Sequence, residues 1–172
     1  MGIRRNYFQT AWVVHDIEAA MKRWLDSSLI GPFFVVPHAQ VENPVYRGRP
    51  SELDMTVAMA QSGPMMIELI QQHDDGPSPY RDSVPAGTDA MHHIAAITDD
   101  FDADLEHYAR IGVDLAFLGS FGDARFGYFD TRDSIGCMTE LLERRPSLEG
   151  LFGMVAAAGA DWDGSDPIRQ VG

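Results

Sequence analysis

Four polar side chains stand where strand-forming stretches would otherwise be apolar. They are Gln9, Glu68, His93 and Glu140. A carboxylate inside an apolar strand, such as the runs 65–70 and 137–142, is costly to bury unless it is paired or bound to a metal. Taken singly, each residue has a plain structural explanation, such as an edge position or a satisfied amide. Taken as a set, they offer oxygen donors and one imidazole, which suit Zn, Ni, Co, Mn or Fe(II).

Gln9 and His93 occupy matching places in two similar stretches of the chain. Each is followed by an apolar run and then by an aspartate seven residues later, Asp16 or Asp100, which precedes a helical pattern. The two glutamates match as well, because each stands before two aliphatic residues near the end of an apolar strand. We therefore predict that one unit occurs twice and that the two copies meet at the metal. Successive side chains of a strand point to opposite faces of the sheet. We therefore expect His92 to point away from His93 and to have a structural role.

The elements that must position these residues follow the same plan twice. We predict strands over 8–14, 33–36, 53–61 and 65–71 in the first unit, and over 93–98, 113–118, 125–130 and 137–142 in the second. One helix follows the first strand of each unit. The chain then divides into a βαβββ module at 1–72, a linker at 73–90, a second βαβββ module at 91–145, and a C-terminal helix with a loosely held tail at 146–172. Residues 37–52, rich in proline, are expected to form an insertion loop.

Charge and composition exclude several classes of partner. The 172 residues carry a net charge of −13, which argues against binding to nucleic acid or to an anionic membrane surface. The single cysteine, Cys137, permits no disulfide within the chain and fits a reducing compartment as a small buried residue. No apolar run is long enough for a membrane helix, and no signal-peptide pattern is present. A cytoplasmic protein with a small-molecule substrate is the expectation.

Several stretches resemble the vicinal oxygen chelate superfamily, which contains glyoxalases, bleomycin resistance proteins and extradiol dioxygenases. They are 8–24 with 31–34, 67–71, 91–111 and 128–143. The resemblance is greatest to the glyoxalase-like branch that holds methylmalonyl-CoA epimerase and glyoxalase I. It implies an α+β fold in which two βαβββ modules form an eight-stranded open barrel around one divalent metal ion. It also implies a homodimer.

The resemblance places the metal ligands at the four polar positions named above. Their order is that of zinc-dependent glyoxalase I, so zinc is the first expectation. The positions at which glyoxalase I binds glutathione hold Val13, Gln72 and Asp89 here, which argues against lactoylglutathione chemistry. The basic residues that remain as candidates for holding a CoA diphosphate are Arg47, Arg49 and Arg125.

The function implied is that of a metal-dependent isomerase, epimerase or lyase acting on a small apolar or aromatic carbonyl compound. The substrate would react through an enolate or enediolate, with Glu140 as the base and Glu68 as the second candidate. The substrate-binding wall is expected from strand parity and neighbouring strands. It comprises Ala11, Val13, Phe33, Met66, Phe126 and Tyr128. Two alternatives remain open: a metal-free small-molecule binding protein of the resistance type, and a ring-cleaving dioxygenase.

Overall fold

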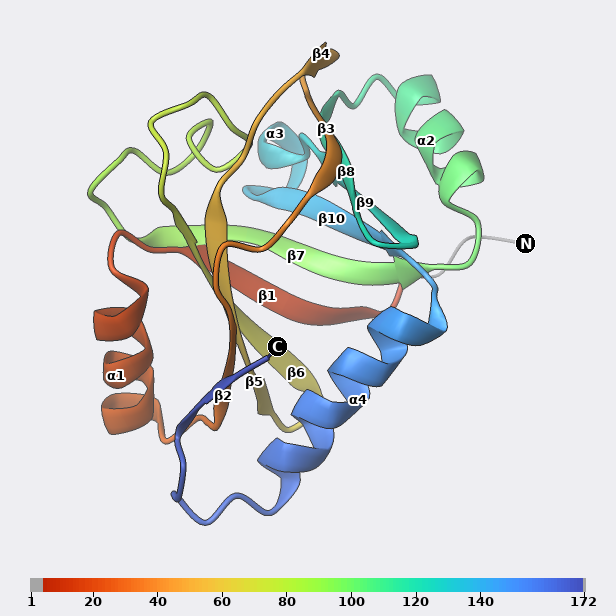
Figure 1. Ribbon diagram of the computed structural model, residues 1–172. Coiled ribbons are helices and arrows are strands. Elements are labelled where there is room, and N and C mark those ends of the chain that lie inside the picture. The colour runs from red at the N-terminus through yellow and green to blue at the C-terminus, as the bar shows by residue number, and fades with distance from the viewer. Residues whose placement is uncertain (1–4, 172) are drawn as a thin grey trace.

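The computed structural model describes residues 5–171, and their strands form one mixed sheet (Figure 1). The strands are β1 (Tyr7–Val13), β2 (Phe33–Val36), β3 (Glu42–Tyr46), β4 (Arg49–Pro50), β5 (Met55–Ser62), β6 (Met65–Gln72), β7 (Ala90–Thr98), β8 (Leu115–Phe121), β9 (Ala124–Phe129), β10 (Met138–Glu143) and β11 (Ile168–Gln170). The helices are α1 (Ile17–Ser28), α2 (Phe101–Arg110), α3 (Arg132–Ile135) and α4 (Pro146–Ala160). Within these described residues, no helix has the length and apolar character needed to span a lipid bilayer.

The strand pairing of the first half of the sheet recurs in the second half. β1 runs parallel to β6. β6 then pairs antiparallel with β5, and β5 pairs antiparallel with β2. In the same way, β7 runs parallel to β10, followed by β9 and β8. The antiparallel pair of β1 and β7 joins the halves at the centre. The α+β class is confirmed and the sheet is open, while the predicted module boundaries stay a prediction.

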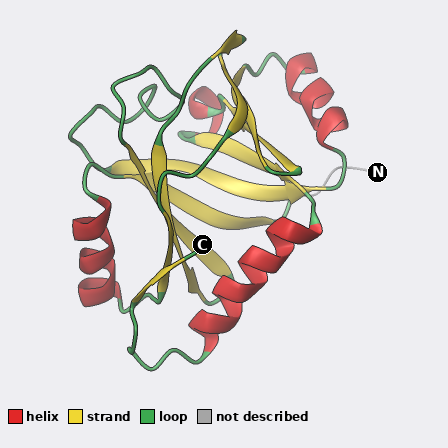
Figure 2. Ribbon diagram, viewed as in Figure 1, coloured by secondary structure: helices red, strands yellow, loops and turns green. Residues whose placement is uncertain are grey.

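The helices that follow β1 and β7 begin as the sequence predicts. The side chains of Asp16 and Asp100 accept hydrogen bonds from the backbone N–H groups of Ala19 and Ala103, at 2.9 and 3.0 Å. These are N-caps, which satisfy amides that a helix start leaves without partners. Figure 2 shows α1 and α2 on the outside of the sheet, each over its own half. The inner face is therefore left for a cavity and for α4.

Residues 37–52 were expected to be a loop, and this prediction is wrong. They form β3 and β4, and β3 pairs with β8 of the other half of the sheet. Proline is tolerated there because β3 lies near the end of the sheet, and Pro44 coincides with a register shift between Glu42 and Val45. Asn43 adopts a left-handed backbone at this irregularity, with φ of 50°.

The C-terminal tail is not loosely held, contrary to expectation. Its strand β11 pairs parallel with β2, with Ile168 opposite Phe33. The indole of Trp162 packs against Gly31, where an added Cβ would meet the ring at 2.7 Å. A glycine is therefore required at position 31 for the tail to lie against the end of α1.

The segment 73–90 crosses between the halves and inserts a side chain into the protein interior. Tyr80 is completely buried, and its ring centroid lies 5.1 Å from that of His92 and 5.8 Å from that of Tyr128. Its hydroxyl lies 3.2 Å from the hydroxyl of Tyr128. Tyr80 therefore anchors this segment over the inner face of the sheet.

Replacing Tyr80 tests this anchoring. Tyr80→Ala should lower the free energy of unfolding by about 3–5 kcal/mol, the cost typical of removing a buried aromatic ring. Tyr80→Phe keeps the ring and should cost about 1 kcal/mol, the value of one hydrogen bond. Urea denaturation measures both changes. A loss below about 1 kcal/mol for Tyr80→Ala would show that the segment is not anchored by this residue.

Candidate metal centre

The central strands place the polar residues in two adjacent rows on the inner face. In one row, Ala11 of β1 pairs with Glu68 of β6 on one side and with His93 of β7 on the other. Neighbouring strands lie about 4.8 Å apart, so the side chains of Glu68 and His93 converge over Ala11. Ala11 is completely buried, and its single methyl group leaves room above it.

The second row repeats this pattern with the halves exchanged. Ala95 of β7 pairs with Gln9 of β1 and with Glu140 of β10. Ala95 is also completely buried and again provides only a methyl group between two longer polar side chains. An alanine therefore lies in the middle of each row, where a larger residue would fill the space that the four polar groups surround.

Three of the four side chains meet within ligand distance of one another. Nε2 of His93 lies 3.1 Å from Oε2 of Glu140 and 3.4 Å from Oε2 of Glu68. One ligand atom from each of these residues lies within 4.8 Å of the others. His93 is completely buried, Glu140 is buried, and the Glu68 side chain is 12% exposed. Such a cluster of charge has little access to water for stabilisation.

The fourth residue, Gln9, lines the same cavity as Glu68 and Glu140. Within residues 5–171, the buried side-chain atoms that have no hydrogen-bond partner are Oε1 of Gln9 and Nε2 of His93. Each such atom costs about 1–3 kcal/mol when it is left without a partner. Both are lone-pair donors, and they join two carboxylates at the same site. The four residues therefore fit a divalent cation held by one nitrogen and three side-chain oxygens.

The electrostatics of the cluster point the same way. Burial raises the pKa of Glu68. Burial alone would lower the pKa of His93, but the negative charges of Glu140 and Glu68 outweigh it and raise that pKa to about 9. The two carboxylates thus favour a positive charge between them, which a proton on His93 or a divalent ion can supply.

His92 does not lie on the opposite face from His93, as simple alternation predicted. Ala11 pairs with His93 whereas Trp12 pairs with Met91, so His92 is an extra residue in a β-bulge. The bulge brings Nδ1 of His92 to 2.9 Å from Nδ1 of His93, and Nε2 of His92 to 2.9 Å from the carbonyl oxygen of Pro79.

These contacts define the tautomers of both imidazoles. The carbonyl of Pro79 can only accept, so Nε2–H of His92 donates to it and Nδ1 of His92 accepts from Nδ1–H of His93. When His93 is neutral, its lone pair is therefore on Nε2, toward the two carboxylates, as a metal ligand requires. Burial, with the adjacent His93, lowers the pKa of His92 to about 3 and keeps it neutral.

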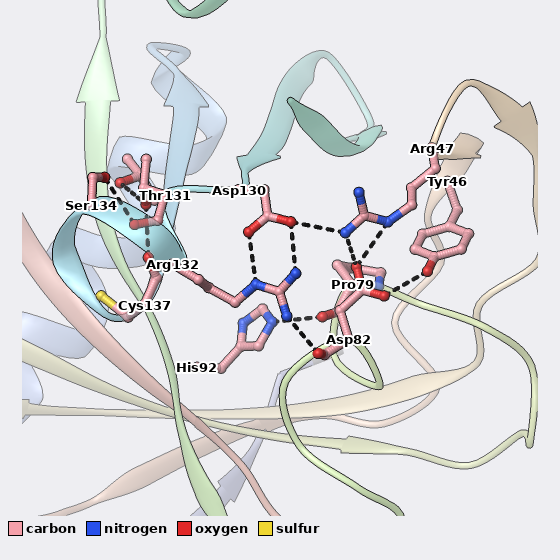
Figure 3. A network of polar contacts seen from close by, with 11 residues as sticks. Tyr46, Arg47, Pro79, Asp82, His92, Asp130, Thr131, Arg132, Ser134 and Cys137 are labelled. Atoms are coloured by element: carbon pink, nitrogen blue, oxygen red, sulfur yellow. Dashed lines mark hydrogen bonds and ion pairs between the residues drawn. The ribbon is translucent and has the colours of Figure 1, made fainter. Parts of the chain in front are cut away.

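An ion network holds the segment that carries Pro79 (Figure 3). Arg132 donates two hydrogen bonds of 2.7 Å to Asp130 and one of 2.5 Å to the carbonyl oxygen of Asp82. Arg47 bridges Asp130 and Asp82 at 2.9 and 2.6 Å. The two arginines hold the pKa of Asp130 far below its usual range. The network connects the β3–β4 hairpin, the segment 73–90 and the start of α3, so the support of His92 comes from three distant parts of the sequence.

A cavity of about 310 Å³ opens between the metal-ligand candidates and helix α4. Gln9, Glu68 and Glu140 are its charged or polar floor. Its wall is mainly apolar and includes Val36, Met55, Val57, Met59, Phe121, Leu148, Leu151 and Phe152. Among the described residues that line it, there is no lysine or arginine. A ligand in this cavity would meet polar groups at one end and apolar groups elsewhere.

The structure places the predicted substrate-binding residues in three different environments. Tyr128 lines the cavity. The apolar core beneath it contains Ala11, Val13, Met66 and Phe126. Phe33 lies on the outer face against α1, so it is not part of this cavity. The run 33–36 is apolar without alternation, so its sequence cannot show that Phe34, rather than Phe33, faces inward.

Sequence reasoning missed two parts of the cavity. Tyr80 lies in a segment whose polar composition indicated only a linker. The C-terminal helix was expected from the sequence, but its side chains Leu148, Leu151 and Phe152 were not assigned to the cavity that it covers. The apolar spacing along α4 was the signal that could have suggested this role.

Comparison with known proteins identifies the family. The family model of the Glyoxalase/Bleomycin resistance protein/Dioxygenase superfamily matches residues 8–128. The chain belongs to this superfamily. Its members commonly bind a divalent metal, and the cluster around His93 supplies suitable groups for one. None of the curated proteins compared with this chain matches it.

Solved structures with low sequence identity share the fold. A hypothetical protein from Bacillus halodurans C-125 is similar at 16% identity with a TM-score of 0.58, over 83% of this chain and 96% of its own. Methylmalonyl-CoA epimerase from Mycobacterium tuberculosis is similar at 17% identity with a TM-score of 0.54, over 84% of this chain and 91% of its own. At these identities, the likeness shows the fold alone.

The role of His92 can be tested through metal affinity. His92→Phe keeps a buried ring but removes the hydrogen bond to Nδ1 of His93, so divalent-metal affinity should fall by about 10- to 100-fold. Competition with a chromophoric chelator measures this change. His107→Phe, on helix α2, is the control and should leave the affinity unchanged. A folded His92→Phe protein with the affinity of the wild type would contradict the assigned role.

Proposed function

We propose that this protein is a divalent-metal-dependent isomerase, epimerase or lyase. It would move a proton at the carbon next to a carbonyl group of a small apolar or aromatic substrate. The observation that carries this proposal is the convergence of Glu68 and Glu140 on His93 at the polar floor of an otherwise apolar cavity. Zinc is the metal that we expect first, with Ni, Co, Mn or Fe as alternatives.

The polar residues of the site would have distinct roles in the reaction. Gln9, Glu68, His93 and Glu140 would hold the metal, which supplies Lewis-acid polarisation of the substrate carbonyl. A carboxylate that is weakly held as a ligand can turn toward the substrate, so Glu140 would take the proton from carbon. Glu68 comes from the opposite half of the sheet, and it would return a proton to the carbon. The apolar wall would exclude water from the reacting carbon.

The shape and charge of the cavity support the substrate class. Its volume of about 310 Å³ is near the lower end for ligand pockets. A phosphate or free carboxylate would find no cationic side chain among the described lining residues, whereas an apolar or aromatic group would contact Met, Val, Leu and Phe side chains. A neutral carbonyl compound therefore suits the cavity best.

A CoA thioester, suggested by the name of the epimerase relative, is supported less well. Two of the three arginines considered for binding the CoA diphosphate already form ion pairs with carboxylates of the protein. Arg47 pairs with Asp82 and Asp130, and Arg125 pairs with Glu143 and Asp102. A diphosphate would have to displace these carboxylates.

Replacing Glu140 tests the proposed reaction. With the active substrate taken from a panel of apolar aldehydes, ketones and thioesters, the wild-type protein should catalyse deuterium exchange next to the carbonyl, as measured by proton NMR. Glu140→Gln should slow this exchange by about 10²- to 10⁴-fold, because the base is lost.

The control is another glutamate of the same strand. Glu143 pairs with Arg125 and Arg145 and does not line the cavity, so Glu143→Gln should keep the exchange rate. Metal content is measured for each variant. A Glu140→Gln protein that binds metal normally and retains full turnover would rule out Glu140 as the base.

A resistance-type binding protein is the second candidate function, and the apolar cavity itself favours it. Metal analysis of protein purified without added metal separates the two. A stoichiometric divalent ion supports the enzyme, and a metal-free protein that binds apolar compounds supports the binding function.

A ring-cleaving dioxygenase is a weaker candidate. The site offers one histidine, whereas the facial triad of iron oxygenases uses two histidines and one carboxylate. Oxygen uptake with Fe(II) and a catechol would overturn this judgement. The homodimer and the cytoplasmic location stay predictions, the first to be checked by the mass of the protein in solution.

A further inference from the structure

We propose that this protein binds a second divalent transition-metal ion at its surface, between His38, Asp54 and His73. His38 follows β2, Asp54 precedes β5 and His73 follows β6. β5 pairs antiparallel with both β2 and β6. The end of β2, the start of β5 and the end of β6 therefore lie side by side. Residues that are far apart in the sequence are therefore placed together by the strand order.

The three side chains are close enough to share an ion. One ligand atom from each lies within 4.8 Å of the others. Nδ1 of His38 is 2.6 Å from Oδ1 of Asp54, and the ring centroids of His38 and His73 are 4.8 Å apart. Small side-chain rotations would bring these atoms to the bond length of about 2.0–2.2 Å that Zn²⁺ requires.

The surrounding contacts hold the ligands in place. Oγ1 of the buried Thr56 lies 2.7 Å from Nε2 of His73 and accepts a hydrogen bond from the backbone N–H of His38 at 3.3 Å. The backbone N–H of His73 donates to the carbonyl of Asp54 at 2.8 Å, and that of Asp54 donates to Asp74 at 2.9 Å. The three segments are therefore tied to one another before any ion binds.

The donor set selects a class of metal. Two imidazoles and one carboxylate suit Zn²⁺, Cu²⁺, Ni²⁺ or Co²⁺ rather than Mg²⁺ or Ca²⁺, which prefer oxygen ligands. The side chains of His38 and Asp54 are 64% and 48% exposed, so an ion can enter from solvent and water can complete its shell. The site is open, unlike the buried cluster around His93.

The charges around the site favour a cation. The groove beside it is lined by Glu52 and Asp74 as well as by Arg47 and Arg49. Arg47 is already paired with Asp82 and Asp130. Arg49 is the arginine of the groove for which no carboxylate partner is described. The negative charges of Glu52 and Asp74 thus exceed its single positive charge.

The surface site is independent of the inner one. His73 lies five residues beyond Glu68 in the chain, and a strand rises about 3.3 Å per residue, so the sites are separated by roughly 16 Å. An ion at one site would therefore leave the ligands of the other unchanged. This separation allows the two sites to be counted separately.

The experiment counts bound metal. Protein freed of metal with a chelator is titrated with Zn²⁺ in the presence of a chromophoric competitor. The wild type should bind one equivalent more than His73→Ala or His38→Ala, and Asp54→Asn should bind this equivalent about 10- to 100-fold more weakly. The same variants in a His93→Ala background should show the same difference, whatever the inner site binds.

The matched control is His15→Ala. His15 is an exposed histidine that also lies 2.7 Å from an aspartate, Asp89, but that pair has Arg23 beside it rather than a second histidine. His15→Ala should bind as many equivalents as the wild type. Equal counts for wild type and His73→Ala would overturn the proposal, and so would an equal loss in His15→Ala, which would indicate adsorption to any exposed histidine.

A second measurement does not depend on any variant. Zn²⁺ should shift the imidazole ¹⁵N resonances of His38 and His73 together at one equivalent beyond the inner site, while those of His15 stay in place. The absence of such shifts in the wild-type protein would overturn the proposal even if a variant failed to fold.

Discussion

The structure depends on how one buried and one largely buried carboxylate are compensated. Glu68 and Glu140 approach a single imidazole at the centre of the sheet, where each unpaired charge would cost several kcal/mol. The electrostatic solution is a positive charge between them. The geometric solution is the pair of buried alanines, Ala11 and Ala95, which leave that position free of other side chains. This arrangement accounts for the polar residues that otherwise contradict the apolar character of the strands.

The topology produces this arrangement because each half of the sheet contributes a carboxylate, Glu68 or Glu140, and a second metal-ligand candidate on a central strand, Gln9 or His93. The parallel pairs β1–β6 and β7–β10 bring the end of each half back beside its beginning. The antiparallel pair β1–β7 then joins the two beginnings. Helices α1 and α2 cover only the outer face, so the inner face remains available for the cavity that α4 closes from the other side.

Segments outside the repeated plan stabilise the site rather than merely connecting its parts. The hairpin of β3 and β4 crosses to the second half, and its Arg47 joins the network that holds Asp82 and Asp130. That network restrains the segment carrying Pro79 and Tyr80, which contact His92 directly. The orientation of His93 is thus coupled to residues from the first half of the chain. The surface cluster of His38, Asp54 and His73 differs in kind, because solvent and not the protein interior surrounds it.

The sequence by itself determined the types of the strands and helices in the two repeated units, the helix caps at Asp16 and Asp100, and the recurrence that selects Gln9, Glu68, His93 and Glu140 as a set. These follow from local periodicity and from the cost of polar groups in apolar strands, both of which can be seen in a single chain. Only the tertiary structure decided that His92 lies in a bulge, that Phe33 faces α1, that residues 42–46 form a strand beside β8, and that Tyr80 enters the interior. Each of these depends on which distant segment supplies the packing partner, and local propensity does not contain that information.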